Sequence, residues 1–449
     1  MRGKIAAVTL VASALALTGC ASTGGTGTPS NQASGAQNIT MWLIGSDTPD
    51  SLRDYLVSQY KTVNGGTLTI EEQTWGDILT KLTTSLPDEN NTPDVTEIGN
   101  TQSPTFTNIG AFADISDMYT QLGGDKLLPS FVEVGQVDGK NYTLPYYFGS
   151  RYVFYRKDVW SAAGVTAPPA TLNDFNQTVA TIAQKNPDSI SGFSGFYLGG
   201  QDWRDGVSWI FANGGDLAKK NGSTWTSTLS DPNTIKGLQQ IQAIYQNASN
   251  APKTAKDASQ YIYLNDSDTS TKDESGNVVN ASLAAATVMA PGWAHWSIGD
   301  LTTNSAGTVA REWNDDKFGV FPLPGNDGKP APVFAGGSNI GISAKSKNQA
   351  GARQLMQIIF SADFQKMLGQ NGLGPANSDY MSSLGTDQFA KALIDSASNS
   401  KLTPAAPGWA TVEASGNLEE FFEKIAEGGD IATLAKQYDD IITPMLNGS

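Results

Sequence analysis

The sequence predicts an α/β protein with two domains or lobes. Segments with strand-like and helix-like patterns alternate along the chain, as they do in α/β folds. About 410 residues follow the polar N-terminal tract, which is more than one hydrophobic core usually accommodates. No later segment holds eighteen or more consecutive apolar residues, so we expect this body to be soluble.

The body opens with strands and helices in alternation. The run "ITMWLIG" is apolar and predicts a buried strand. The run "PDSLRDYLVSQYKTV" places apolar residues at helical spacing and ends at Asn64-Gly65-Gly66. The same criteria predict this order: strand 39–45, helix 49–63, strand 67–72, helix 76–86, strand 93–98 and a polar loop over 99–106.

The rest of the body continues this alternation. Residues 142–160 give two strand-like runs that we expect to be broken at Gly149. The tract 253–280 is polar and predicts loops, and we find no convincing internal repeat. Later helices are predicted at 171–186, 231–247, 349–360 and 363–370, and in the C-terminal stretch 417–445.

The N-terminus predicts a secretory signal peptide over residues 1–19. A short cationic start precedes an apolar run, Ile5 to Leu17, that is too short to span a bilayer. The single cysteine, Cys20, follows in "LTGC", and one thiol forms neither an internal disulfide nor a structural zinc site. The tetrad resembles the lipobox of bacterial lipoproteins, in which this cysteine is acylated, with palmitate as the expected chain. A plain signal peptide with an incidental cysteine is the alternative.

Residues 20–37 predict a flexible tether between this lipid anchor and the body. The tract has no charge and no bulky apolar residue, so its end-to-end distance is about 20–25 Å. Removal of residues 1–19 takes away Arg2 and Lys4 and changes the formal net charge from −15 to −17. Such a balance disfavours binding to nucleic acid or to an anionic membrane surface, so the lipid has to provide the anchoring.

The sequence excludes several kinds of site. His295 is the only histidine, which rules out a multi-histidine metal site, and we expect no metal and no cofactor. The chain contains no G-x-S-x-G motif and no glycine-rich phosphate loop. Two suitably spaced carboxylates remain possible among 44 acidic residues, so glycoside hydrolysis stays open as an alternative.

Tryptophans in loop-like settings are the main candidates for ligand contact. Trp293 follows Pro291-Gly292 directly after the strand-like run 287–290, where ligands of open α/β sheets bind. Trp203 lies in a polar stretch flanked by glycines, whereas Trp209 is expected in the core. Two further tryptophans, Trp75 and Trp409, are also placed in loops, with a core position as the alternative.

An indole face against the C–H face of a sugar buries apolar area and leaves the hydroxyls at the rim, where polar groups are needed. Cationic residues are scarce near these loops apart from Arg151 and Arg204, which favours a neutral ligand. The polar candidates and the glycines that let backbone N–H groups approach a ligand are Asp47, Asn100, Gln102, Asp202, Gly336, Gly337 and Ser338.

Several motifs, in this order and spacing, resemble the carbohydrate-binding lipoproteins of ABC importers, the solute-binding family that includes maltose-binding protein. The resemblance covers nearly the whole chain. The motifs are "MWLIGSD", "TPDVTEIGNTQSPTF", "LPYYFGSRYVFYRKDVW", "FANGGD", "MAPGW", "GVFPLP" and "GGSNIGISAKSKNQAGARQLMQIIFS".

The resemblance implies two α/β lobes joined by hinge crossings near 149–153, 320–324 and 370–376, with a sugar bound in the cleft between them. Lobe one is then 38–150 with 323–372, and lobe two is 151–322 with 373–449. It further implies Trp293, Trp203 and Trp409 as stacking groups, and Asp47, Asn100 and Gln102 as polar cleft positions. Gly149 stands where maltose-binding protein has an acidic residue, so the ligand's identity is not carried over.

The leading hypothesis is a lipid-anchored, monomeric receptor on the extracytoplasmic face of a bacterial membrane. It would capture a neutral oligosaccharide and deliver it, unchanged, to the permease subunits of an ABC transporter. The alternatives are an extracellular glycoside hydrolase that uses two cleft carboxylates and a surface adhesin for polymeric glycans.

Overall fold

The computed structural model describes residues 35–256, 260–266, 283–303, 309–397 and 399–448. Within these ranges, all residues from Ala36 onward belong to one compact unit. The signal peptide, Cys20 and most of the predicted tether lie outside the described residues. In the part of the chain that the structure describes, no helix is long and apolar enough to cross a membrane.

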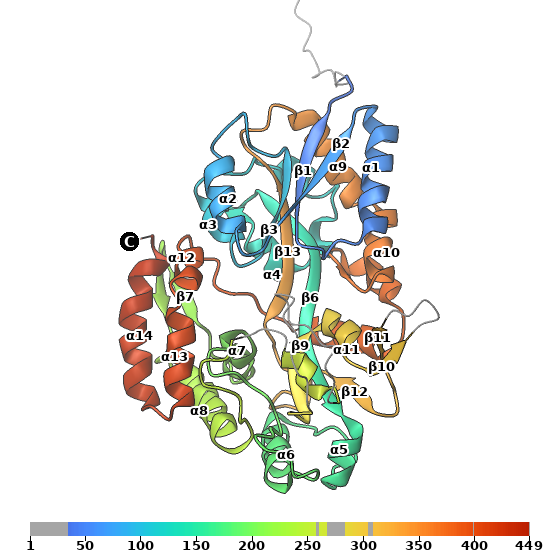
Figure 1. Cartoon of the computed structure of the whole chain (residues 1–449). Coiled ribbons are helices and arrows are strands. Elements are labelled where there is room, and N and C mark those ends of the chain that lie inside the picture. Colours follow the sequence, from blue (N-terminus) through green and yellow to red (C-terminus); the bar gives the residue numbers. More distant parts are fainter. Residues whose placement is uncertain (1–34, 257–259, 267–282, 304–308, 398, 449) are drawn as a thin grey trace, which may run out of the picture. The chain divides into compact units, whose positions relative to one another are not determined.

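The centre of the fold is an eight-stranded mixed sheet (Figure 1). Six strands follow the order β12-β6-β13-β3-β1-β2, and β9 and β14 also pair with β6. The strands of this sheet are β1 (Ile39–Ile44), β2 (Leu68–Gln73), β3 (Val95–Gly99), β6 (Thr143–Arg156), β9 (Thr287–Pro291), β12 (Phe318–Phe321), β13 (Ala335–Ile342) and β14 (Gly374–Pro375).

Short two-stranded ribbons accompany the central sheet. They are β4 (Gln136–Val137) with β5 (Lys140–Asn141), β7 (Ala218–Asn221) with β8 (Thr224–Ser227), and β10 (Asp300–Thr303) with β11 (Val309–Glu312). Each of these pairs is antiparallel.

α-Helices cover the sheet, and the helices nearest the C-terminus form a group to one side of it (Figure 1). The α-helices are α1 (Asp50–Asn64), α2 (Ile78–Ser85), α3 (Ser103–Asn108), α4 (Pro129–Glu133), α5 (Lys157–Ala162), α6 (Leu172–Lys185), α7 (Trp203–Ala212), α8 (Pro232–Asn247), α9 (Gln349–Ile359), α10 (Ala362–Gln370), α11 (Gln388–Ala397), α12 (Trp409–Ala414), α13 (Asn417–Ala426) and α14 (Ile431–Leu446). Short 3-10 helices are η1 (Ser116–Met118), η2 (Gly124–Lys126), η3 (Gln260–Leu264), η4 (Gly292–Ser297) and η5 (Ser378–Leu384).

The central position of strand β1 in the sheet explains why its sequence is apolar at every position but one. It lies between β2 and β3 and pairs with both in parallel. Met41 and Leu43 pack with α1, α9 and α10, whereas Trp42 and Ile44 pack on the opposite face with α2 and α3. A strand covered by helices on both faces needs apolar side chains pointing both ways, as the sequence predicted.

Strand β6 is continuous, so the predicted break at Gly149 is wrong. Residues 143–150 pair with β13, and residues 151–156 pair with β9 and β12. Gly149 pairs with Gly336 in this ladder, and a Cβ built on it would meet nothing within 4 Å. The glycine therefore leaves open space beside the strand and does not interrupt its hydrogen bonds.

Two large hydrophobic clusters lie at opposite ends of β6. One joins β1 and the first half of β6 to α1, α9 and α10. The other joins Val153 of β6 to α5, α6, α7, α8, α13 and α14. Figure 1 shows β6 running from the first group of helices to the second. A continuous strand thus connects two separately packed regions.

The later helices agree with the sequence prediction. The C-terminal stretch 417–445 forms two helices, α13 and α14. The interruption is local, because Asp430 accepts a hydrogen bond from the N–H of Thr433 at 2.9 Å and begins a new helix. The polar tract 253–280 also contains the helix η3, whose Tyr261 and Leu264 are buried.

Candidate functional site

A pocket of about 380 Å³ lies beside the middle of β6, where strands and helices from both ends of the fold meet. Its lining comes from the ends of β3, β9 and β13, from η3 and η4, and from α7 and α12. The lining residues are Trp75, Gly99, Asn100, Thr101, Gln102, Arg151, Arg204, Gln260, Tyr261, Pro291, Trp293, Phe334, Gly336, Gly337 and Glu413.

Two half-exposed tryptophans, Trp75 and Trp293, line this pocket, and each is 41% exposed. Trp293 follows β9 on η4, in the position that the sequence predicted. The ring of Tyr261 meets Trp293 edge-to-face, with centroids 5.4 Å apart and planes at 86°. Trp75 donates its indole N–H to Asp47 Oδ2 at 3.2 Å. The pocket therefore has two supported aromatic surfaces that solvent still reaches.

Strand β13 contributes backbone to the pocket where a side chain would not fit. Gly337 has a φ of 124°, and a Cβ built on it would lie 2.5 Å from the carbonyl oxygen of Tyr147. Only glycine fits such a position. Gly336 and Gly337 line the pocket, whereas the next residue, Ser338, is fully buried and does not.

The loop after β3 supplies amide groups. Asn100 is nearly buried, and its amide N–H donates to the carbonyl oxygen of Ala335 at 3.1 Å, which ties this loop to β13. Gln102 also lines the pocket, and its Oε1 has no hydrogen-bond partner among the described residues. Gln102 thus offers an acceptor to a hydroxyl group, and Asn100 holds the loop in place.

Both arginines in the pocket are paired with carboxylates. Arg151 Nε lies 2.7 Å from Asp205 Oδ1, and both side chains are buried. Arg204 pairs with Glu413 and lies over the ring of Trp203, 4.5 Å from its centroid. These pairs cancel the formal charge of the two cations that reach the pocket.

Trp203 does not reach the pocket, and its predicted polar loop setting is wrong. It is the first residue of α7, is fully buried, and packs against Phe334 and Trp409. Asp202 is the N-cap of this helix and accepts from the N–H of Asp205 at 3.0 Å. The polar residues that suggested a loop are the cap and first turn of a buried helix.

Trp409 is also excluded from the pocket in this structure. It begins α12, is 1% exposed, and its indole meets Trp203 with centroids 6.3 Å apart. Asp202 and Ser338 likewise do not line the pocket. Asp47 lies behind it, where it holds Trp75 and accepts from Tyr147 at 3.0 Å.

Burial raises the pKa of two acidic side chains on the Trp75 side of the pocket. Glu97 on β3 is fully buried, accepts the N–H of Ile44 at 2.8 Å, and burial raises its pKa to about 8. Burial also raises the pKa of Asp47 above its usual value, and hydrogen bonds from Tyr147 and Trp75 oppose this shift. These carboxyls are part of the support of the pocket.

The sequence did not identify several lining residues, among them Gln260, Tyr261, Phe334 and Glu413. Tyr261 belongs to "QYIYL", an apolar cluster inside the polar tract, and that cluster was the available signal. Glu413 comes from α12, far along the chain, and no local pattern marks it. Among the described residues, no group of three or more His, Cys, Asp and Glu side chains could hold a metal ion.

Comparison with known proteins gives the family. Residues 55–393 match the family of bacterial extracellular solute-binding proteins. The chain belongs to this family. The family is extracellular, which places the protein outside the cytoplasm.

Individual relatives agree with this assignment. The diacetylchitobiose binding protein DasA of Streptomyces coelicolor is 29% identical over 446 residues, which cover 98% of this chain and 97% of DasA. The sugar-binding protein MalE from Xanthomonas citri has a TM-score of 0.72 at 18% identity and covers 91% of this chain and 97% of its own. The GacH receptor of Streptomyces glaucescens has a TM-score of 0.70 at 19% identity, with 92% and 98% covered. The two-lobed α/β fold predicted from the sequence is confirmed.

Proposed function

We propose that this protein is the receptor of an ABC importer for a neutral oligosaccharide, which it binds between Trp75 and Trp293 and passes unchanged to a membrane permease. The observation that carries the proposal is the pocket itself. It combines two half-exposed indoles with amide groups and with backbone at glycine positions. Flat apolar faces next to hydrogen-bonding groups match the two surfaces of a sugar ring.

The paired arginines support a neutral ligand. A phosphate or carboxylate group would need a cation that is available to it, because charge-assisted hydrogen bonds supply most of the affinity for such groups. Arg151 and Arg204 already pair with Asp205 and Glu413. Uncharged hydroxyl groups fit this arrangement better than an anion does.

The relatives' names support a saccharide in particular. DasA is named for diacetylchitobiose, and a structural neighbour was solved as a cyclo/maltodextrin-binding protein with maltotetraose. The ligands used to test the proposal should therefore include N,N′-diacetylchitobiose, maltose and maltotetraose.

Glycoside hydrolysis is less well supported by the pocket. Hydrolysis needs two carboxyl groups on either side of the bond that breaks. Among the lining residues, Glu413 is the one carboxylate, and it is held by Arg204. We therefore propose binding without chemistry.

The two sides of β6 are proposed to act as lobes that close on the sugar. We keep the lobes as 38–150 with 323–372 and 151–322 with 373–449. In support, the N–H of Ala410 on α12 donates to Thr105 Oγ1 on α3 at 3.2 Å, a bond between these two proposed lobes beside the pocket. Solution scattering with and without sugar would test closure.

We also propose that Cys20 carries the lipid that keeps the receptor at the outer face of the membrane, with the body acting as a monomer. The support is the "LTGC" sequence and the uncharged tract that follows it. Cys20→Ala should release the protein from the membrane fraction or leave it unprocessed. Unchanged fractionation and processing would refute the anchor.

The receptor function is tested by calorimetric titration of the purified protein with the three sugars, followed by chromatography of the recovered sugar. We expect saturable binding of at least one sugar, which is recovered intact. Shortened products would favour the hydrolase, and no binding of any of these short sugars would favour the adhesin.

A further inference from the structure

One corner of the pocket is made by two 3-10 helices that are far apart in the sequence. Helix η3 (Gln260–Leu264) provides Gln260 and Tyr261, and η4 (Gly292–Ser297) provides Trp293. The edge-to-face contact of Tyr261 with Trp293 is made across these two helices. Short 3-10 helices have poor internal hydrogen-bond geometry, so their relative position must be fixed from outside.

Asn265 joins the ends of these helices. It follows η3 directly, and its side chain is fully buried. Its amide N–H donates to the carbonyl oxygen of Ser297, the last residue of η4, at 2.9 Å. Its amide oxygen accepts the N–H of Gly299 at 3.0 Å. The amide thus uses both its donor and its acceptor on the chain that leaves η4.

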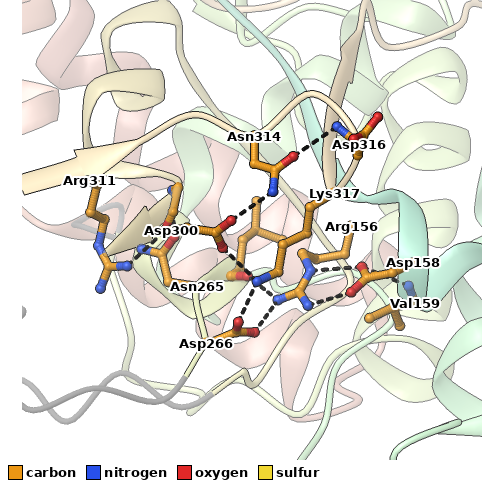
Figure 2. A network of polar contacts seen from close by, with 12 residues as sticks. Arg156, Asp158, Val159, Asn265, Asp266, Asp300, Arg311, Asn314, Asp316 and Lys317 are labelled. Carbon is orange, nitrogen blue, oxygen red and sulfur yellow. Dashed lines mark hydrogen bonds and ion pairs between the residues drawn. The ribbon is translucent and has the colours of Figure 1, made fainter. Parts of the chain in front are cut away.

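An ion-pair cluster holds the backbone on either side of Asn265. Arg156 has a side chain that is 4% exposed, and it donates to the carbonyl oxygen of Leu264 at 2.8 Å and to Asp266 at 3.0 Å. Lys317 pairs with Asp266 and lies 2.7 Å from Asp300. Figure 2 shows Arg156 and Lys317 both directed at Asp266.

The segment after η4, which contains the partner Gly299 of Asn265, is held by further hydrogen bonds. Arg311 donates to the carbonyl oxygen of Gly299 at 2.9 Å, and Asn314 donates to Asp300 at 2.7 Å. The segment after η4 is therefore held from the β10–β11 side, and the segment after η3 is held by Arg156 and Lys317 (Figure 2). Asn265 bridges these two anchored segments.

We propose that Asn265 is a positioning residue for the sugar site: it sets the distance and angle between Tyr261 and Trp293 and so the face that the pocket presents to a sugar. This inference rests on the proposed function in one respect, which is that the ligand of the pocket is a sugar. Asn265 does not line the pocket, and its effect passes through the ends of the two helices.

The test replaces Asn265 and observes Trp293 directly. Protein labelled with 5-fluorotryptophan gives a fluorine resonance for Trp293, which is assigned by its loss in Trp293→Phe. We expect Asn265→Ala to shift or broaden this resonance in the absence of any sugar and to leave the Trp75 resonance unchanged. Affinity for the best of the three sugars should fall about tenfold, as expected when a central aromatic contact is misplaced.

Asn447→Ala is the control for loss of a bridging amide away from the pocket, at an exposed position. Asn447 also bridges two segments, since it donates to the carbonyl oxygen of Trp225 at 2.8 Å and accepts the N–H of Trp225 at 2.8 Å, but it does not line the pocket. This variant should leave the Trp293 resonance in place and the affinity within about twofold of the wild type, because its contacts lie outside the site.

Asn265→Asp keeps the size and the acceptor but replaces the donor to Ser297 with a charged carboxylate oxygen, so it is a second variant that breaks this bond if the alanine variant does not fold. If both variants fold, an unchanged Trp293 resonance in both would overturn the positioning role. If the aspartate variant is the one that folds, an unchanged resonance in it would do the same. If none of the sugars binds, the receptor function fails, and the fluorine signal still decides the role of Asn265.

Discussion

Trp293 and Trp203 look alike in the sequence and differ completely in the structure. Both stand close to glycine in loop-like settings of the sequence, yet Trp293 is 41% exposed in the pocket and Trp203 is fully buried. The difference lies in what the neighbouring residues do. Pro291-Gly292 ends a strand before Trp293, whereas Asp202 caps a helix that begins with Trp203.

The glycine near each tryptophan has a different purpose. Gly206 lies one turn into α7, where a Cβ would come within 2.4 Å of the ring of Phe422, so it permits close helix packing. A glycine that ends a strand frees the next side chain, and one inside a helix brings a neighbour closer. The comparison teaches that a glycine-flanked tryptophan lines a pocket where it follows the end of a strand, and is buried where it begins a packed α-helix.

The largest expected effect is on stability at Trp203. Trp203→Ala should lower the free energy of unfolding by about 3–5 kcal/mol, because it leaves a large cavity in the core. Trp209, fully buried on the same helix, is the matched comparison and should cost a similar amount when changed to alanine. Denaturant unfolding measures both, and a Trp203→Ala protein as stable as the wild type would contradict the buried assignment.

Replacement of Trp293 should lower the affinity for sugar. Trp293→Ala should weaken sugar binding by about 2 kcal/mol, roughly thirtyfold, because a stacked ring at the centre of a site dominates the affinity. Trp296 on the same helix is 57% exposed but does not line this pocket, so Trp296→Ala should bind like the wild type. Titration calorimetry of both variants makes the comparison, and equal affinities would remove Trp293 from the site.

The Trp75 side of the pocket rests on a buried acid, and its stability should depend on pH. Glu97 has a folded pKa of about 8 against an ordinary value of 4.5, so between these values the folded protein keeps a proton that the unfolded chain releases. The free energy of unfolding should therefore decrease as pH rises from about 5 to 8, by up to about 1.4 kcal/mol per unit.

Glu97→Gln should flatten this dependence, since the amide keeps the acceptor for Ile44 and cannot ionise. Denaturant unfolding of the two proteins at several pH values between about 5 and 8 measures the difference. Parallel pH profiles for the wild type and the variant would show that Glu97 is not the titrating group.

The smallest effect is expected at Asp47, which supports Trp75 from behind. Asp47→Asn weakens the acceptor of the indole N–H and of Tyr147, and a hydrogen bond of this kind contributes about 1 kcal/mol. Sugar affinity should fall severalfold, less than in Trp293→Ala. Titration measures it, and a loss as large as that of Trp293→Ala would mean that Asp47 contacts the sugar itself.

Local patterns were sufficient for most of the elements. Strand β1 is apolar on both faces, and α1 ends at Gly65, so periodicity and capping residues gave their positions closely. The continuity of β6 was not predictable in this way. Whether Gly149 breaks a strand depends on the partner strand, and Gly336 of β13 lies far along the chain.

The site was predictable where the residue lies at the end of a strand of the sheet. Trp293, Asn100, Gln102 and Gly337 line the pocket for this reason, because strand ends meet at one edge. Tyr261 and Glu413 line it through tertiary packing, which no single segment encodes. Trp203 was misplaced because its helix cap and a polar loop have the same composition.

The central claim is that a sugar lies between Trp75 and Trp293, and a crystal structure with a bound sugar tests it most directly. The sugar from the three-member set that binds best would be co-crystallised with the mature protein. We expect a ring stacked on the Trp293 indole, with a hydroxyl group within hydrogen-bond distance of Gln102 Oε1. A sugar bound elsewhere, with both indoles free of contact, would contradict the account.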